Sequence, residues 1–132
     1  MKLSPHFTLR EMTATSYPQL QDKPSTQAVV NMVYLCACVL EPLRERAGHA
    51  LLINSGYRSA KLNDRVGGVA NSYHLRGLAA DLRCLTEADA IELRAYCKDI
   101  PACDLALVER KGKAVWLHVQ TTIERQPRRL AK

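Results

Sequence analysis

The stretch NSYHLRGLAAD, residues 71–81, ends in an acid that lies inside an otherwise apolar run. It contains His74, one of four histidines in the chain, and it continues as LAADLRC (78–84), whose alternating side chains are typical of a strand. A carboxylate buried in such a strand is costly unless it is paired or binds a metal. The stretch therefore predicts a strand that carries a functional acid, Asp81, preceded by a loop that carries a histidine.

Outward from this strand, the hydrophobic pattern predicts an α+β fold with a small, mostly antiparallel sheet, a long N-terminal helix and a second helix. Ser25 is the expected N-cap of the long helix, Pro42 is expected to kink it, and Gly48 is expected to follow its end. In chain order, the predicted elements are a helix over 25–47, a strand over 50–54, a loop over 55–72, a strand over 78–84, a helix over 87–98, and a hairpin with strands 105–110 and 115–120 around the turn KGKA.

The composition is typical of a single folded domain. The chain has 132 residues, of which 47% are hydrophobic, and a short segment with Phe7, Leu9 and Met12 is expected to dock on the core. No apolar run approaches the roughly 20 residues of a membrane span, and the N-terminus lacks the apolar region of a secretory signal. We therefore expect no signal peptide, synthesis in the cytoplasm and no membrane insertion. Five cysteines without a CxxC pair indicate reduced thiols rather than a disulfide framework.

The net charge of +6 and the pI near 9.2 favour an anionic partner, such as nucleic acid or a bacterial cell wall. Part of this charge lies in a basic tail, residues 125–132, which we expect to be a flexible end. Aromatic residues make up only 5% of the chain and do not alternate with the basic ones, which argues against single-strand nucleic acid binding. We therefore expect no nucleic acid partner.

Three residues are candidate metal ligands: His74, Asp81 and His118, the last at the centre of WLHVQ (116–120). Two imidazoles and one carboxylate form a donor set that suits zinc and leaves a fourth position open. Each residue also has an ordinary interpretation when taken alone. His74 fits a polar surface position, His118 fits a core histidine, and Asp81 fits a salt-bridge partner, and their spacing does not decide between these alternatives.

Taken together, the segments SGYRSAKLNDRVGG (55–68), NSYHLRGLAADLR (71–83) and WLHVQ (116–120) closely resemble the M15 family of zinc D-Ala-D-Ala peptidases. The resemblance covers about residues 3–120 and is nearest to the small, phage-associated, endolysin-like branch. The family signature S-x-H-x-x-G-x-A-x-D is present as Ser72, His74, Gly77, Ala79 and Asp81. The resemblance implies a hedgehog/D-Ala-D-Ala-peptidase-like fold and a single zinc peptidase domain over residues 1–132.

By this resemblance, His74, Asp81 and His118 bind one Zn²⁺ per chain. The substrate would be a peptidoglycan stem peptide, cut by a carboxypeptidase or an endopeptidase at a D-Ala-D-Ala or similar bond. The enzyme would reach the cell wall after release or lysis. The competing interpretation is a zinc-containing, cell-wall-binding module of the same fold without activity. The sequence leaves the oligomeric state open.

The resemblance also assigns residues around the metal. Arg58 matches an arginine that contacts substrate near the scissile bond or at its terminal carboxylate; a salt bridge that braces the loop is its alternative role. Ser72 would bind substrate or cap the loop, and Tyr57 would line the cleft or pack in the core. Gly77 and Ala79 are expected to be small so that the chain can pass close to the metal.

The general base is the point at which the sequence departs from the family pattern. Many relatives place an acid three residues before the last histidine, where this chain has Val115. Glu109 is the best replacement, provided that it shares a sheet face with His118. It would then act as general base toward the attacking water and as acid toward the leaving amine. The alternative for Glu109 is a cross-strand pair with a lysine.

Overall fold

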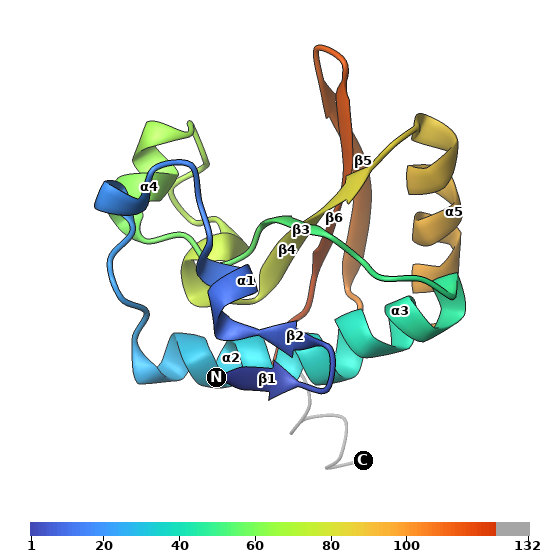
Figure 1. Ribbon diagram of the computed structural model, residues 1–132, viewed down its shortest axis with the longest axis horizontal. Coiled ribbons are helices and arrows are strands. Elements are labelled where there is room, and N and C mark those ends of the chain that lie inside the picture. The colour runs from blue at the N-terminus through green and yellow to red at the C-terminus, as the bar shows by residue number, and fades with distance from the viewer. Residues whose placement is uncertain (124–132) are drawn as a thin grey trace.

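The computed structural model describes residues 1–123 and confirms an α+β fold built on a small antiparallel sheet (Figure 1). The basic tail, residues 125–132, lies outside the described residues. Four strands pair in the order β3-β4-β6-β5, and every pair is antiparallel. Their bounds are β3 Ile53–Ser55, β4 Ala79–Cys84, β5 Leu105–Lys111 and β6 Ala114–Gln120.

The long helix is present and crosses below the sheet in Figure 1. It consists of α2 (Thr26–Leu35), a π-helical segment η2 (Cys36–Leu40) and α3 (Glu41–Ala47). Ser25 caps its start by accepting a hydrogen bond from the Ala28 amide at 3.1 Å, and Gly48 follows its end with φ 77°. The π-helical segment lies next to Pro42, whose missing N–H removes one regular helical hydrogen bond. The structure therefore has a π-helical segment just before Pro42, where the sequence predicts a kink.

This helix is more apolar than we expected from the sequence. By length and composition alone, the 22-residue helix Thr26–Ala47 is sufficient to cross a membrane, and its most apolar 18-residue window has a mean hydropathy of 1.4. The expectation that no apolar run approaches this length is therefore wrong. The reason is that one face of the helix forms much of the core: Met32, Leu35, Val39 and Leu43 are fully buried.

The N-terminal segment docks on the core as predicted. It forms β1 (Lys2–Ser4), β2 (Phe7–Thr8) and α1 (Leu9–Thr13), and α1 begins with a capping box between Thr8 and Glu11. Phe7 and Met12 are buried, and Leu9 packs against the same core cluster. This segment therefore covers the part of the core from which the site loop departs.

The segment predicted as a loop, residues 55–72, contains the short helix α4 (Ala60–Arg65) and is followed by the 3-10 helix η3 (Tyr73–Arg76). Side chains from outside this segment hold its backbone. Gln21, which follows the 3-10 helix η1 (Pro18–Leu20), donates to the Tyr57 carbonyl at 2.8 Å and accepts from the Ser59 amide at 2.8 Å. Ser59 in turn donates to the Leu20 carbonyl at 2.8 Å. The segment is thus ordered by contacts that are distant in sequence.

The two faces of the sheet differ in chemistry because side chains alternate along each strand. One face belongs to the core and includes Ala80, Leu82, Leu117 and Val119, all fully buried. Helix α5 (Glu87–Cys97), capped by Thr86, packs on β5 and β6. The hairpin turns at Gly112 with φ 60°, as the KGKA motif predicts. The opposite face carries the polar residues of the site.

Candidate metal centre

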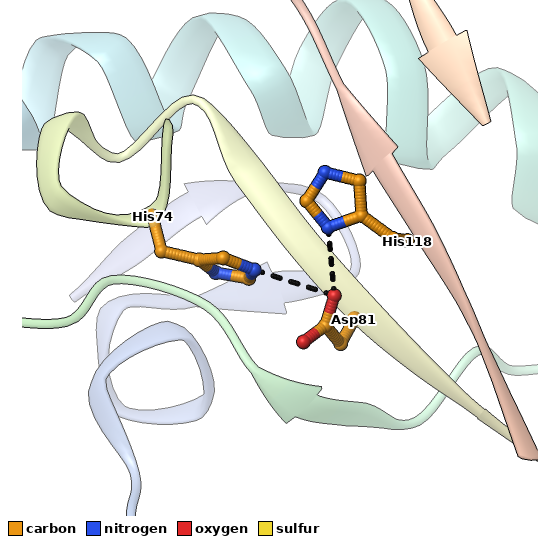
Figure 2. Close-up of side chains that lie close together, drawn as sticks. All are labelled: His74, Asp81 and His118. Atoms are coloured by element: carbon orange, nitrogen blue, oxygen red, sulfur yellow. Dashed lines mark hydrogen bonds and ion pairs between the residues drawn. The ribbon is translucent and has the colours of Figure 1, made fainter. Parts of the chain in front are cut away.

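Three side chains from different elements converge on one point beside the sheet (Figure 2). His74 Nε2 lies 3.3 Å and His118 Nδ1 lies 3.0 Å from the same oxygen, Oδ1 of Asp81. The three candidate ligand atoms all lie within 4.8 Å of one another. His74 has only 2% of its side chain exposed, and the other two have 14% each. The sequence-predicted ligands are therefore assembled into a partly buried cluster.

The sheet register places two of these residues. Asp81 on β4 lies directly opposite His118 on β6, so both side chains project from the same face. His74 comes from η3, whose first turn is capped by Ser72: the Ser72 hydroxyl accepts a hydrogen bond from the His74 amide at 3.2 Å. A strand pair and a short helix thus approach the point from two sides.

Gly77 joins η3 to β4, and the reason for its small size differs from the expected one. Its φ of 74° is left-handed, which glycine adopts without strain. A Cβ atom at this position would lie 2.6 Å from the Ala28 carbonyl oxygen and 2.9 Å from Met32 Cγ. Close approach to helix α2, rather than to a metal, is therefore what requires glycine here.

The ring of His74 is oriented by the backbone. Its Nδ1–H donates to the Gly56 carbonyl at 2.7 Å, so Nε2 faces Asp81. Gly56 itself lies close to α1, since a Cβ there would be 2.5 Å from the Met12 carbonyl oxygen. The sequence does not predict that the Gly56 carbonyl orients His74, because a carbonyl contact depends on the path of the backbone rather than on residue type.

The ring of His118 also contacts a second residue that sequence reasoning missed, Gln120. Oε1 of Gln120 lies 2.7 Å from His118 Nε2. The available signal was the strand period, because residues two apart on a strand share a face.

The electrostatics follow from this packing. Burial opposes the charge on Asp81, yet its hydrogen bonds with His118 and His74 outweigh that effect and hold the pKa of its carboxyl group well below the usual range. For His118, burial favours the neutral ring, but the hydrogen bonds with Asp81 and Gln120 outweigh burial and raise its pKa. Asp81 is therefore a stable anion, available to a cation.

Arg58 lies next to this cluster. Burial lowers its pKa, partly offset by the charges of Asp81 and Glu109. Its Nη2 donates to the Ser72 hydroxyl at 3.4 Å, and among the described residues its buried Nε has no hydrogen-bond partner. A buried donor without an acceptor is unfavourable, and an oxygen of a bound ligand would satisfy it. Ser72 therefore has the loop-capping role and also contacts Arg58.

Glu109 meets the condition set by the sequence. It lies opposite Trp116 on the neighbouring strand, and Trp116 Nε1 donates to Glu109 Oε1 at 2.8 Å. Trp116 and His118 are two residues apart on β6, so Glu109 shares their face. Its charge acts on both His118 and Arg58. The partner of Glu109 is thus a tryptophan rather than a lysine.

Val115 belongs to the other face of β6. It lies three positions before His118, and an odd offset on a regular strand reverses the side-chain direction. In this chain an acid at that position would point away from the cluster. Tyr57 is also away from the cleft: it is 9% exposed and belongs to the core cluster, so the structure favours its core-packing alternative.

The donor set fits a zinc ion. Each ring is aimed by a second hydrogen bond, the carboxylate is ionised, and two imidazoles with one carboxylate supply three of the four ligands that zinc takes. The group His74, Asp81 and His118 can therefore hold a metal ion with an open position, the arrangement found in catalytic zinc sites.

Comparison with known proteins identifies the family of the chain. The family model of Peptidase M15 matches residues 5–120, which is most of the chain. No curated protein sequence matches the chain significantly. Because the match includes the loop, both histidines and the acid, the cluster lies within the region that defines the family. The chain belongs to the Peptidase M15 family of metallopeptidases.

Proposed function

We propose that the protein is a zinc-dependent hydrolase of peptide bonds in peptidoglycan stem peptides, with cleavage at a D-Ala-D-Ala or similar D-residue bond. The observation that carries the proposal is the convergence of His74, Asp81 and His118, with Glu109 on the same sheet face and Arg58 in the neighbouring loop segment. A binding module would need the ligands alone. A carboxylate and a guanidinium beside them are the groups that hydrolysis requires.

A zinc ion held by the three ligands would polarise the scissile carbonyl and make water a better nucleophile. Glu109 takes the proton of the attacking water and delivers it to the leaving amine. Its Oε1 is held by Trp116, which fixes the direction in which the carboxylate acts. Arg58 donates from Nε to the substrate oxygen that becomes negative, since this donor has no partner among the described residues.

The proposed setting follows from charge and family. The net charge of +6 favours approach to an anionic cell wall, and the family match favours a peptidoglycan peptide as substrate. The protein would act on the wall after release from the cell or after lysis.

The test is digestion of two substrates with zinc-loaded protein, followed by mass spectrometry. A free stem pentapeptide ending in D-Ala-D-Ala reports carboxypeptidase activity, and a cross-linked sacculus reports endopeptidase activity. The proposal expects new amine and carboxyl ends from at least one substrate, and no product after removal of zinc with a chelator. Binding to the sacculus without cleavage of either substrate would instead establish the non-catalytic wall-binding module.

A further inference from the structure

The two histidines of the metal centre present different nitrogens to Asp81. His74 uses Nε2, because its Nδ1–H is taken by the Gly56 carbonyl. His118 uses Nδ1, which lies 3.0 Å from Asp81 Oδ1, while its Nε2 lies 2.7 Å from Gln120 Oε1. An amide oxygen only accepts, so His118 Nε2 carries a proton, and Nδ1 is the nitrogen that can offer a lone pair to a metal in place of its contact with Asp81.

Gln120 is well placed to enforce this choice. It follows His118 by two residues on β6, a central strand of the sheet, and it is paired with Ala79 on one side and Leu105 on the other. Its carbonyl also accepts a hydrogen bond from the Asp104 amide at 2.9 Å. The backbone that carries the amide is therefore held on both sides by neighbouring segments.

The dependence on a side chain distinguishes His118 from His74. The carbonyl that orients His74 belongs to the backbone and is kept by any residue that fits at position 56. The acceptor that orients His118 is lost with a single substitution. A neutral amide also leaves the charge of the cluster unchanged, whereas a second carboxylate would add to the charge of Asp81.

We propose that Gln120 is a positioning residue that holds His118 with Nε2 protonated, so that Nδ1 faces the metal position together with His74 Nε2. This inference rests on the proposed zinc-binding function. A metal on Nδ1 is compatible with the hydrogen bond from Nε2 to Gln120, because the two groups occupy different nitrogens of the ring. Without the acceptor at position 120, the ring is free to rotate or to change its protonated nitrogen, and both changes oppose binding through Nδ1.

The test compares zinc affinity by competition with a chromogenic chelator in three proteins: wild type, Gln120→Met and Gln120→Glu. Loss of a second hydrogen bond of this kind typically weakens metal binding by about 10- to 100-fold. We expect a weakening of that order for Gln120→Met and affinity near that of wild type for Gln120→Glu, which keeps an acceptor oxygen. The melting temperature of the metal-free Gln120→Met protein should stay close to that of wild type, which separates positioning from a general loss of structure.

The nitrogen assignment is read directly from long-range ¹H–¹⁵N spectra of the zinc-loaded wild-type protein. We expect His118 to show a protonated Nε2 and a metal-bound Nδ1. Equal zinc affinity of wild type and Gln120→Met, or a metal-bound Nε2 in His118, would overturn the inference. A zinc-loaded protein with the expected assignment that cleaves no peptidoglycan would refute the proposed peptidase function and leave the role of Gln120 intact.

Discussion

Replacement of Gly77 by alanine tests why the chain between His74 and Asp81 needs glycine. The substitution places a Cβ on a left-handed residue with φ 74°, which costs about 1–2 kcal/mol. The new atom would also lie 2.6 Å from the Ala28 carbonyl oxygen and 2.9 Å from Met32 Cγ. Overpacking of this kind typically costs a further 1–3 kcal/mol. We therefore expect Gly77→Ala to destabilise the protein by about 2–5 kcal/mol.

Gly67→Ala is the matched control. Gly67 has φ 76°, almost the same as Gly77, but nothing lies within 4 Å of its Cβ position. In both variants alanine is strained at a positive φ, and in both the unfolded chain loses the backbone freedom of a glycine. The difference in stability between the two variants therefore isolates the contact with helix α2. With an unfolding entropy of about 2.1 cal/mol/K per residue over 132 residues, a loss of 1 kcal/mol in the free energy of unfolding lowers the melting temperature by about 4 °C.

The assay is thermal unfolding of the metal-free proteins followed by circular dichroism. We expect Gly77→Ala to melt about 4–11 °C below Gly67→Ala. Metal-free protein is the informative state, because proximity to a metal cannot lower its stability. Equal melting temperatures for the two variants would refute the packing explanation and leave close approach to the metal as the reason for glycine at position 77.

Three further predictions concern the site and the core. Glu109→Gln should lower kcat by about 10²- to 10⁴-fold with zinc content unchanged, while the exposed Glu92→Gln keeps full activity; steady-state kinetics on a stem peptide measures both. Arg58→Lys keeps the charge but loses the Nε donor, so kcat should fall by about 10²- to 10³-fold, and wild-type turnover would exclude Arg58 from the reaction. Burial raises the pKa of Glu41, but hydrogen bonds from Ser4 and His6 outweigh it and lower the pKa below 4.5. Above that pH, Glu41→Gln should therefore be less stable than wild type by the full contribution of the Glu41 carboxylate. This difference should vanish as the pH falls through the lowered pKa, and a pH-independent difference in melting temperature would contradict the expectation.

The hairpin, the long helix and helix α5 were predictable from local signals. Gly112 between two alternating apolar runs defines the turn between β5 and β6, and Ser25 and Thr86 mark the starts of α2 and α5 through their caps. These signals are local because each depends on hydrogen bonds within a few residues.

Features that depend on distant contacts were missed. Helix α4 is short, and the segment that carries it is held by Gln21, which lies 38 residues before Ser59. The local sequence pattern does not predict such long-range hydrogen bonds. Likewise, the π-helical segment beside Pro42 is one of several ways to accommodate a proline, and local sequence does not distinguish between them.

The site shows the same division. Residue types alone made His74, Asp81 and His118 candidates, and the resemblance to a family joined them. Their convergence depends on the register of β4 against β6, which pairs residues 37 positions apart. The register also explains why Val115 is not the position to examine for a base: it faces away from His118, and Glu109 lies on the correct face.

The central claim is that His74, Asp81 and His118 hold one catalytic zinc ion. The most direct measurement is a crystal structure of zinc-loaded protein, with anomalous diffraction recorded on both sides of the zinc absorption edge. We expect one strong peak per chain, in contact with His74 Nε2, a carboxylate oxygen of Asp81 and His118 Nδ1. A peak at another set of residues, or fully zinc-loaded protein with no peak between these three side chains, would contradict it.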